Sequence, residues 1–163
     1  MKLDIREALQ RLNDSAAMQN FKKKYSGAFL LSFLLIADYN KLESTAWIIN
    51  FYNPENNKIH AFEINETIKS KPEQDLIKQT NDISELKLDL VKLTFNEAFT
   101  RANEIFVKEG LNQASSLIAL LQNIDGSPVW TITFLLAMFN SFSIKIDACN
   151  GMIIESKKSK LIN

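Results

Sequence analysis

Ser44-Thr-Ala-Trp-Ile-Ile-Asn-Phe51 (STAWIINF) is the stretch that decides the fold, because its pattern returns as Ser127-Pro-Val-Trp-Thr-Ile-Thr-Phe134 (SPVWTITF), 83 residues later. Both tryptophans of the chain lie in these stretches, at the same place in each. The match continues toward the start of each copy, where the corresponding pairs are Leu3 and Leu93, Glu7 and Glu97, Ala8 and Ala98, and Gly27 and Gly110. Self-similarity of this kind indicates two copies of one supersecondary unit.

Each copy opens with a sequence typical of a helix start. A capping residue is followed three positions later by glutamate, in Asp4-x-x-Glu7 and in Thr94-x-x-Glu97. Apolar residues then recur at helical spacing, which predicts one helix over about 4–24 and another over about 94–109. The first copy has 7 more residues between its opening and its glycine, so we expect its helix to be two turns longer.

After each helix the apolar spacing changes from helical to alternating, the pattern of strands. We expect Gly27 and Gly110 to end the helices with positive φ. The expected strands lie at 29–37, 46–52 and 58–64 in the first copy, and at 116–121, 129–139, 142–147 and 152–155 in the second. Asn150-Gly151 predicts a tight turn into the last of these strands, and the first copy lacks such a turn.

The predicted fold class is α+β, with two tandem repeats of one helix packed on an antiparallel β-meander. The organisation divides into a first repeat at 1–65, a connector at 66–92, a second repeat at 93–155 and a polar tail at 156–163. We expect the connector to hold a short helix over 72–79 and an extended docking segment with Leu86, Leu88 and Leu90, and the tail to be frayed. Periodicity does not decide whether the two sheets join or stay separate.

The second repeat resembles a PepSY domain. The matching motifs are Leu93-Thr-Phe-Asn-Glu-Ala98, Val129-Trp-Thr-Ile-Thr-Phe134, and the final hairpin from Ser143 through Asp147 and Gly151 to Ile153. The resemblance implies a cystatin-like, PepSY-like layout and a protein that is not catalytic. Members of the family occur in propeptides of secreted thermolysin-type metallopeptidases and in cell-envelope proteins, where they are thought to bind or restrain partners.

The composition is that of an ordinary globular domain with no global electric field. Nineteen acidic and nineteen basic side chains cancel, so we expect no nucleic-acid and no membrane partner. Cys149 is the only cysteine, which excludes an intramolecular disulfide and fits a cytoplasmic location. Lysines at 22–24 before the apolar run 28–37 also have the basic and apolar parts of a secretory signal, but the counterpart at 111–120 in the second copy is half polar and favours a strand.

Residues that carry chemistry are few. His60 is the only histidine, which excludes any centre that needs two imidazoles. Cys149 has no base nearby in its turn, and Asp147 with Asn150 lacks the ligand spacing of a calcium loop. We therefore predict no catalytic residue, no cofactor and no metal.

The runs 29–37 and 129–139 are apolar on both faces, whereas a sheet with one wet face should alternate. The second face must be covered by the connector or the other repeat, or form an interface, and we expect Leu135 and Phe139 to be mostly buried in the functional assembly. The predicted function is a non-enzymatic binding protein, monomer or homodimer, with a protein or peptide partner. The candidate binding surface is Trp47, Trp130, Leu135 and Phe139. The alternative is a small-molecule carrier whose pocket lies between helix and sheet and is lined by Trp47 or Trp130.

Overall fold

The strands of both halves join in one antiparallel sheet. A computed structural model describes residues 2–76 and 83–160. In these residues the sheet has nine strands, eight of them in the order β4-β3-β2-β1-β6-β7-β8-β9, with β5 beside β3. Their bounds are β1 Phe29–Asp38, β2 Trp47–Asn53, β3 Lys58–Ile64, β4 Ile68–Ser70, β5 Gln74–Asp75, β6 Ser116–Ile124, β7 Ser127–Leu135, β8 Asn140–Asp147 and β9 Ile153–Lys160. The α+β class and the antiparallel sheet are confirmed.

β1 and β6 form the centre of the sheet, and their pairing answers whether the strands of the two halves join or stay in separate sheets. They pair antiparallel from Ser32 opposite Gln122 to Asp38 opposite Ser116, so the two sets of strands are continuous. Leu86 continues the hydrogen bonding of β1 beyond the end of β6. Its N–H donates to the carbonyl of Leu30 at 2.9 Å. Its side chain is buried in the core, whereas that of Leu90 is exposed. Leu88–Leu90 form a 3₁₀ turn, so the extended segment expected through Leu86, Leu88 and Leu90 is wrong from Leu88 on.

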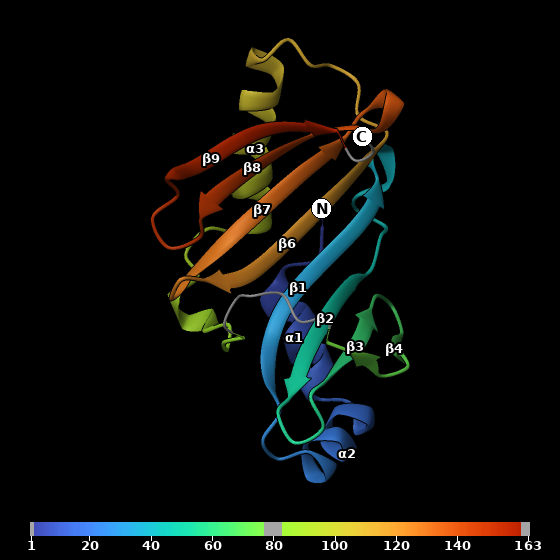
Figure 1. The fold of residues 1–163 in the computed structure, drawn as a ribbon. Coiled ribbons are helices and arrows are strands. Elements are labelled where there is room, and N and C mark those ends of the chain that lie inside the picture. The colour runs from blue at the N-terminus through green and yellow to red at the C-terminus, as the bar shows by residue number, and fades with distance from the viewer. Residues whose placement is uncertain (1, 77–82, 161–163) are drawn as a thin grey trace.

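Within the described residues, three α-helices cover one face of the sheet, which we call the inner face (Figure 1). They are α1 Ile5–Asn13, α2 Ala16–Lys24 and α3 Phe95–Lys108. The first two pack against β2 and β3, and α3 packs against β7 and β8. The predicted capping box of α3 is present, since Thr94 Oγ1 accepts from the Glu97 N–H and the Glu97 carboxylate accepts from the Thr94 N–H.

The single long helix expected over 4–24 is wrong. The chain leaves helical geometry at Ser15, whose φ and ψ are extended and whose hydroxyl accepts from the Met18 N–H at 3.2 Å. Ser15 therefore caps a second helix, because its side chain satisfies an amide that the first turn leaves unpaired. Gly110 follows α3 with φ of 76° as predicted, whereas Gly27 is not among the positive-φ residues and α2 ends at Lys24, with Tyr25 as its C-cap.

Four expectations about strands need correction. The run 129–139 is a strand only to Leu135, after which Ala137–Phe139 form a turn in which Met138 and Phe139 have positive φ. The first half has a short fourth strand, β4, that pairs with β3. The helix expected over 72–79 is replaced by β5 at Gln74–Asp75, and its last residues lie outside the described ones. The tail is not frayed at 156–160, because β9 pairs with β8 as far as Lys160.

Candidate functional site

Trp47 and Trp130 lie at the centre of the core between the sheet and the helices. Both side chains are fully buried, with ring centroids 6.1 Å apart, and both rings pack against Phe95 of α3. Trp47 Nε1 donates to the Leu3 carbonyl at 2.8 Å, and Trp130 Nε1 donates to the Leu93 carbonyl at 3.0 Å. A partner cannot contact either indole in this fold, so the candidate surface has to be placed elsewhere.

The amine of Lys2 lies over the face of the Trp47 ring. Its Nζ lies 5.3 Å from the centroid of the Trp47 ring, an arrangement in which a cation is attracted to the ring face. Burial lowers the pKa of Lys2 from 10.5 to about 8, because removing the ammonium from water disfavours its charged form.

Leu135 and Phe139 are not neighbours on one strand face as the sequence indicated. Leu135 ends β7 and is half-buried. Phe139 lies beyond the strand in the turn to β8, where its side chain is 62% exposed. Burial of both in the functional assembly stays a prediction, and the chain by itself leaves Phe139 exposed. The reason is local, because the strand stops before the run of apolar residues does.

The face of the sheet opposite the helices carries an apolar patch on its central strands, which we call the outer patch: Leu34, Ile36, Ile48, Ile118 and Leu120. Side chains alternate between the faces of a strand, and Phe33 and Leu35 point into the core, so Leu34 and Ile36 point outward. Leu34 lies opposite both Ile48 and Leu120, and Ile36 lies opposite Ile118. The outer patch is thus continuous across β2, β1 and β6.

The patch lies on the side of the sheet away from the three helices, and the described parts of the chain leave it partly exposed (Figure 1). Ile36 is 54% exposed, and its four neighbours in the patch are partly exposed. Polar pairs border it on both sides. Asn50 Nδ2 donates to Ser32 Oγ at 3.0 Å, and the hydroxyls of Thr133 and Ser143 are bonded at 2.7 Å. A limited apolar area with a polar border is typical of an interaction surface.

A hollow of about 370 Å³ lies between α2, β3 and the segment around β5. Phe21, Tyr25 and His60 pack in its wall, with 4.9 Å between the His60 ring and each of the other two ring centroids. Glu73 Oε1 lies 3.5 Å from His60 Nε2 and accepts from the Tyr25 hydroxyl at 3.2 Å. Burial lowers the pKa of His60 below 6.5, while the nearby Glu73 carboxylate acts to raise it.

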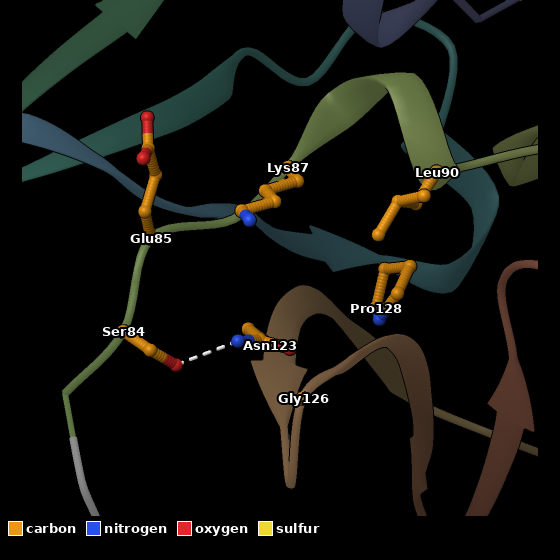
Figure 2. A pocket seen from close by; sticks show the side chains of 7 residues that line it. All are labelled: Ser84, Glu85, Lys87, Leu90, Asn123, Gly126 and Pro128. Carbon is orange, nitrogen blue, oxygen red and sulfur yellow. Dashed lines mark hydrogen bonds between the residues drawn. The ribbon is translucent and has the colours of Figure 1, made fainter.

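A second hollow, of about 260 Å³, lies between the connector and the β6–β7 turn. Figure 2 shows Leu90 facing Pro128 across it, and the amide of Asn123 directed at Ser84. Asn123 Nδ2 donates to Ser84 Oγ at 2.6 Å, so these two polar groups satisfy each other. This contact fixes the connector to the sheet.

Asp147, one of the side chains singled out for chemistry, has a structural role. The Asp147 carboxylate accepts from the N–H groups of Cys149 and Asn150, as an aspartate that forms a turn does. Cys149 is an exposed free thiol. Among the described residues, no group of three or more His, Cys, Asp or Glu side chains is placed to hold a metal ion.

Comparison with known proteins supports the fold. No family model matches the chain, and no curated protein matches it. Among solved structures, the chain is similar to a protein from Clostridium difficile 630 described as a "putative lipoprotein". The sequence identity is 20%, the match covers 88% of this chain and 90% of that chain, and the TM-score is 0.56. Within residues 2–76 and 83–160, no helix has the length and apolarity needed to cross a membrane.

Proposed function

We propose that this chain is a non-enzymatic binding protein and that the outer patch receives a protein or peptide partner. The observation that carries the proposal is the exposure of Ile36 at the centre of a continuous apolar area on β2, β1 and β6. Burying one such side chain contributes about 1.5–3 kcal/mol. A partner that covers the patch therefore has a favourable free energy available that the isolated chain does not use.

The shape of the patch favours a macromolecule over a small ligand. Small molecules bind in concave sites that enclose most of their surface. The outer patch lies on a sheet face, and neither of the two hollows described above includes any of its residues. An extended peptide or a protein surface that presents apolar side chains fits such a face.

We also propose that the two halves are copies of one unit, as the sequence repeat and the PepSY resemblance suggest. Each tryptophan donates to the leucine that precedes the first helix of its own half, Leu3 for Trp47 and Leu93 for Trp130. The strands of each half follow each other outward from the centre in chain order, β1 to β4 and β6 to β9. Both relationships support duplication, because they repeat a specific contact and a topology.

A small-molecule carrier is the second candidate, and the His60 hollow is the observation that favours it. Among the described residues, His60 Nε2 is buried and makes no hydrogen bond, although Glu73 Oε1 lies 3.5 Å away, and it lies beside two aromatic rings. A buried polar atom in this state is unfavourable unless a bound group satisfies it. The hollow differs from the pocket expected from the sequence, which was to be lined by Trp47 or Trp130.

Native mass spectrometry of the purified protein separates the two candidates. The proposed function predicts the mass of a monomer or homodimer with no additional small molecule. A stoichiometric small molecule that leaves when His60 is replaced, in His60→Phe, would contradict it and favour the carrier. Ser156→Ala, on the exposed strand β9, is the matched control that should leave the spectrum unchanged.

A further inference from the structure

The turn between β7 and β8 holds two large apolar residues in a conformation that suits neither. Met138 and Phe139 both have φ of 61°, and the Asn140 N–H donates to the Ala137 carbonyl. Two successive residues with positive φ are the pattern of a type I′ turn, for which Asn-Gly and Asp-Gly are preferred. The side chains are 87% and 62% exposed, so core packing does not explain why they are there.

The preceding turn of the same sheet is an internal comparison. Asp125 and Gly126, between β6 and β7, have φ of 51° and 85°. This turn uses the residue types that a left-handed backbone accepts. The β6–β7 turn therefore has residues that suit positive φ, whereas the β7–β8 turn has methionine and phenylalanine at the corresponding positions. Strain held by an exposed side chain points to a role for that side chain.

The local charge beside this tip is positive although the chain as a whole is neutral. Lys160 of β9 lies opposite Asn140, and Lys157 lies opposite Ser143. Lys158 lies between them and pairs with Glu109 at 3.3 Å. The end of the sheet thus combines two exposed apolar side chains with a short basic strand.

We propose that the Met138–Phe139 tip inserts into the interfacial layer of an anionic lipid bilayer, with Lys157 and Lys160 at the headgroups. Two side chains are far too small for a specific protein interface, which buries on the order of 1,000 Å² or more. Reversible membrane attachment, in contrast, is built from one small apolar insertion together with basic residues. The inference goes beyond the proposed function, since the tip lies apart from the outer patch.

Co-sedimentation of the whole protein with vesicles tests this proposal. The probes are vesicles of phosphatidylcholine mixed with phosphatidylglycerol and vesicles of phosphatidylcholine alone. We expect binding to the mixed vesicles that is at least tenfold stronger than to the neutral ones and that falls with salt. Met138→Asn with Phe139→Gly should abolish binding, and Lys157→Gln or Lys160→Gln should weaken it about fivefold each.

The control is Ile153→Ser with Ile154→Ser, an exposed apolar pair at the opposite end of β9, which should leave vesicle binding unchanged. Because the turn variant receives favourable turn residues, its melting temperature should not fall, and loss of binding cannot then be due to unfolding. A wild-type protein that ignores both kinds of vesicle, or a turn variant that binds as well as wild type, would overturn the proposal. A protein partner lost by the turn variant, with no vesicle binding by wild type, would assign the tip to that partner instead.

Discussion

Trp47 and Trp130 lie 6.1 Å apart at the centre of the core, and each indole donates to the backbone of the leucine before the first helix of its half. The two bonds tie the start of α1 to β2 and the start of α3 to β7. They also explain why both tryptophans are buried, since an indole N–H needs an acceptor when it leaves water.

Trp47→Phe and Trp130→Phe should each lower the free energy of unfolding by about 2–3 kcal/mol, because each leaves a carbonyl unpaired and a cavity behind. Urea unfolding followed by circular dichroism measures this. The double variant should differ from the sum of the single ones, since the rings interact in one cluster. A loss in the free energy of unfolding that differs several-fold between Trp47→Phe and Trp130→Phe would contradict the proposal that the two positions are equivalent.

Ser15→Ala should destabilise the protein by about 1 kcal/mol, because α2 then loses its N-terminal cap. The hydroxyl of Ser15 also donates to the Leu12 carbonyl at 2.6 Å, so it links the end of α1 to the start of α2. Thermal unfolding measures the effect, with the exposed Ser156→Ala as the control that stays near wild type. Equal stability of the two variants would show that the break between α1 and α2 does not depend on this cap.

The turn between β7 and β8 should become more stable when its residues are made favourable. Met138→Asn with Phe139→Gly should raise the free energy of unfolding by about 1–2 kcal/mol, because large side chains no longer occupy positive φ. Asp125→Met with Gly126→Phe should lower it by a similar amount at the β6–β7 turn. Denaturant unfolding of both variants checks the pair, and a stability unchanged in both would mean that the left-handed backbone carries no strain.

His60 should titrate below its ordinary pKa of 6.5, because burial disfavours its charged form. Glu73→Gln should lower the pKa further by removing the carboxylate that stabilises the imidazolium. Since the chain has one histidine, its C2 proton in NMR spectra gives an unambiguous reading.

The same shift makes stability depend on pH. The unfolded chain binds the His60 proton more tightly than the folded one, so the free energy of unfolding should fall as pH drops through 6.5 toward the lower folded pKa. In His60→Phe this part of the acid sensitivity should disappear. A folded-state pKa above 6.5 would contradict the assignment of burial as the main cause.

Alternating apolar residues predicted most of the sheet correctly. β1, β2, β3 and β6 begin within one residue of their predicted starts, because an apolar inner face imposes a period of two whatever the outer face carries. The sequence also placed Trp47 and Trp130 in corresponding stretches, and both side chains are buried in the core. What periodicity could not give was the pairing of β1 with β6, which is a contact between segments far apart in the chain.

The errors have local physical causes. Asn13, Asp14 and Ser15 are weak helix formers and good caps, and this signal for the break between α1 and α2 was outweighed by the apolar stripe. β9 has no alternation, since its stability comes from pairing with β8 and from ion pairs such as Lys145 with Glu155 at 3.5 Å. The β7–β8 turn was missed because Met138 and Phe139 are not turn residues, and such local conflicts are expected at functional positions.

Affinity capture with the intact protein and two single variants tests the central claim most directly. Ile36→Lys places a charge at the centre of the outer patch, and Val107→Lys places one on α3, where the wild-type side chain is similarly exposed. With folding of all three verified by thermal melting, we expect wild type and Val107→Lys to retain the same protein from the source lysate and Ile36→Lys to retain at least tenfold less. Equal retention by Ile36→Lys, or no retained protein with wild type, would contradict the claim that this face binds a partner.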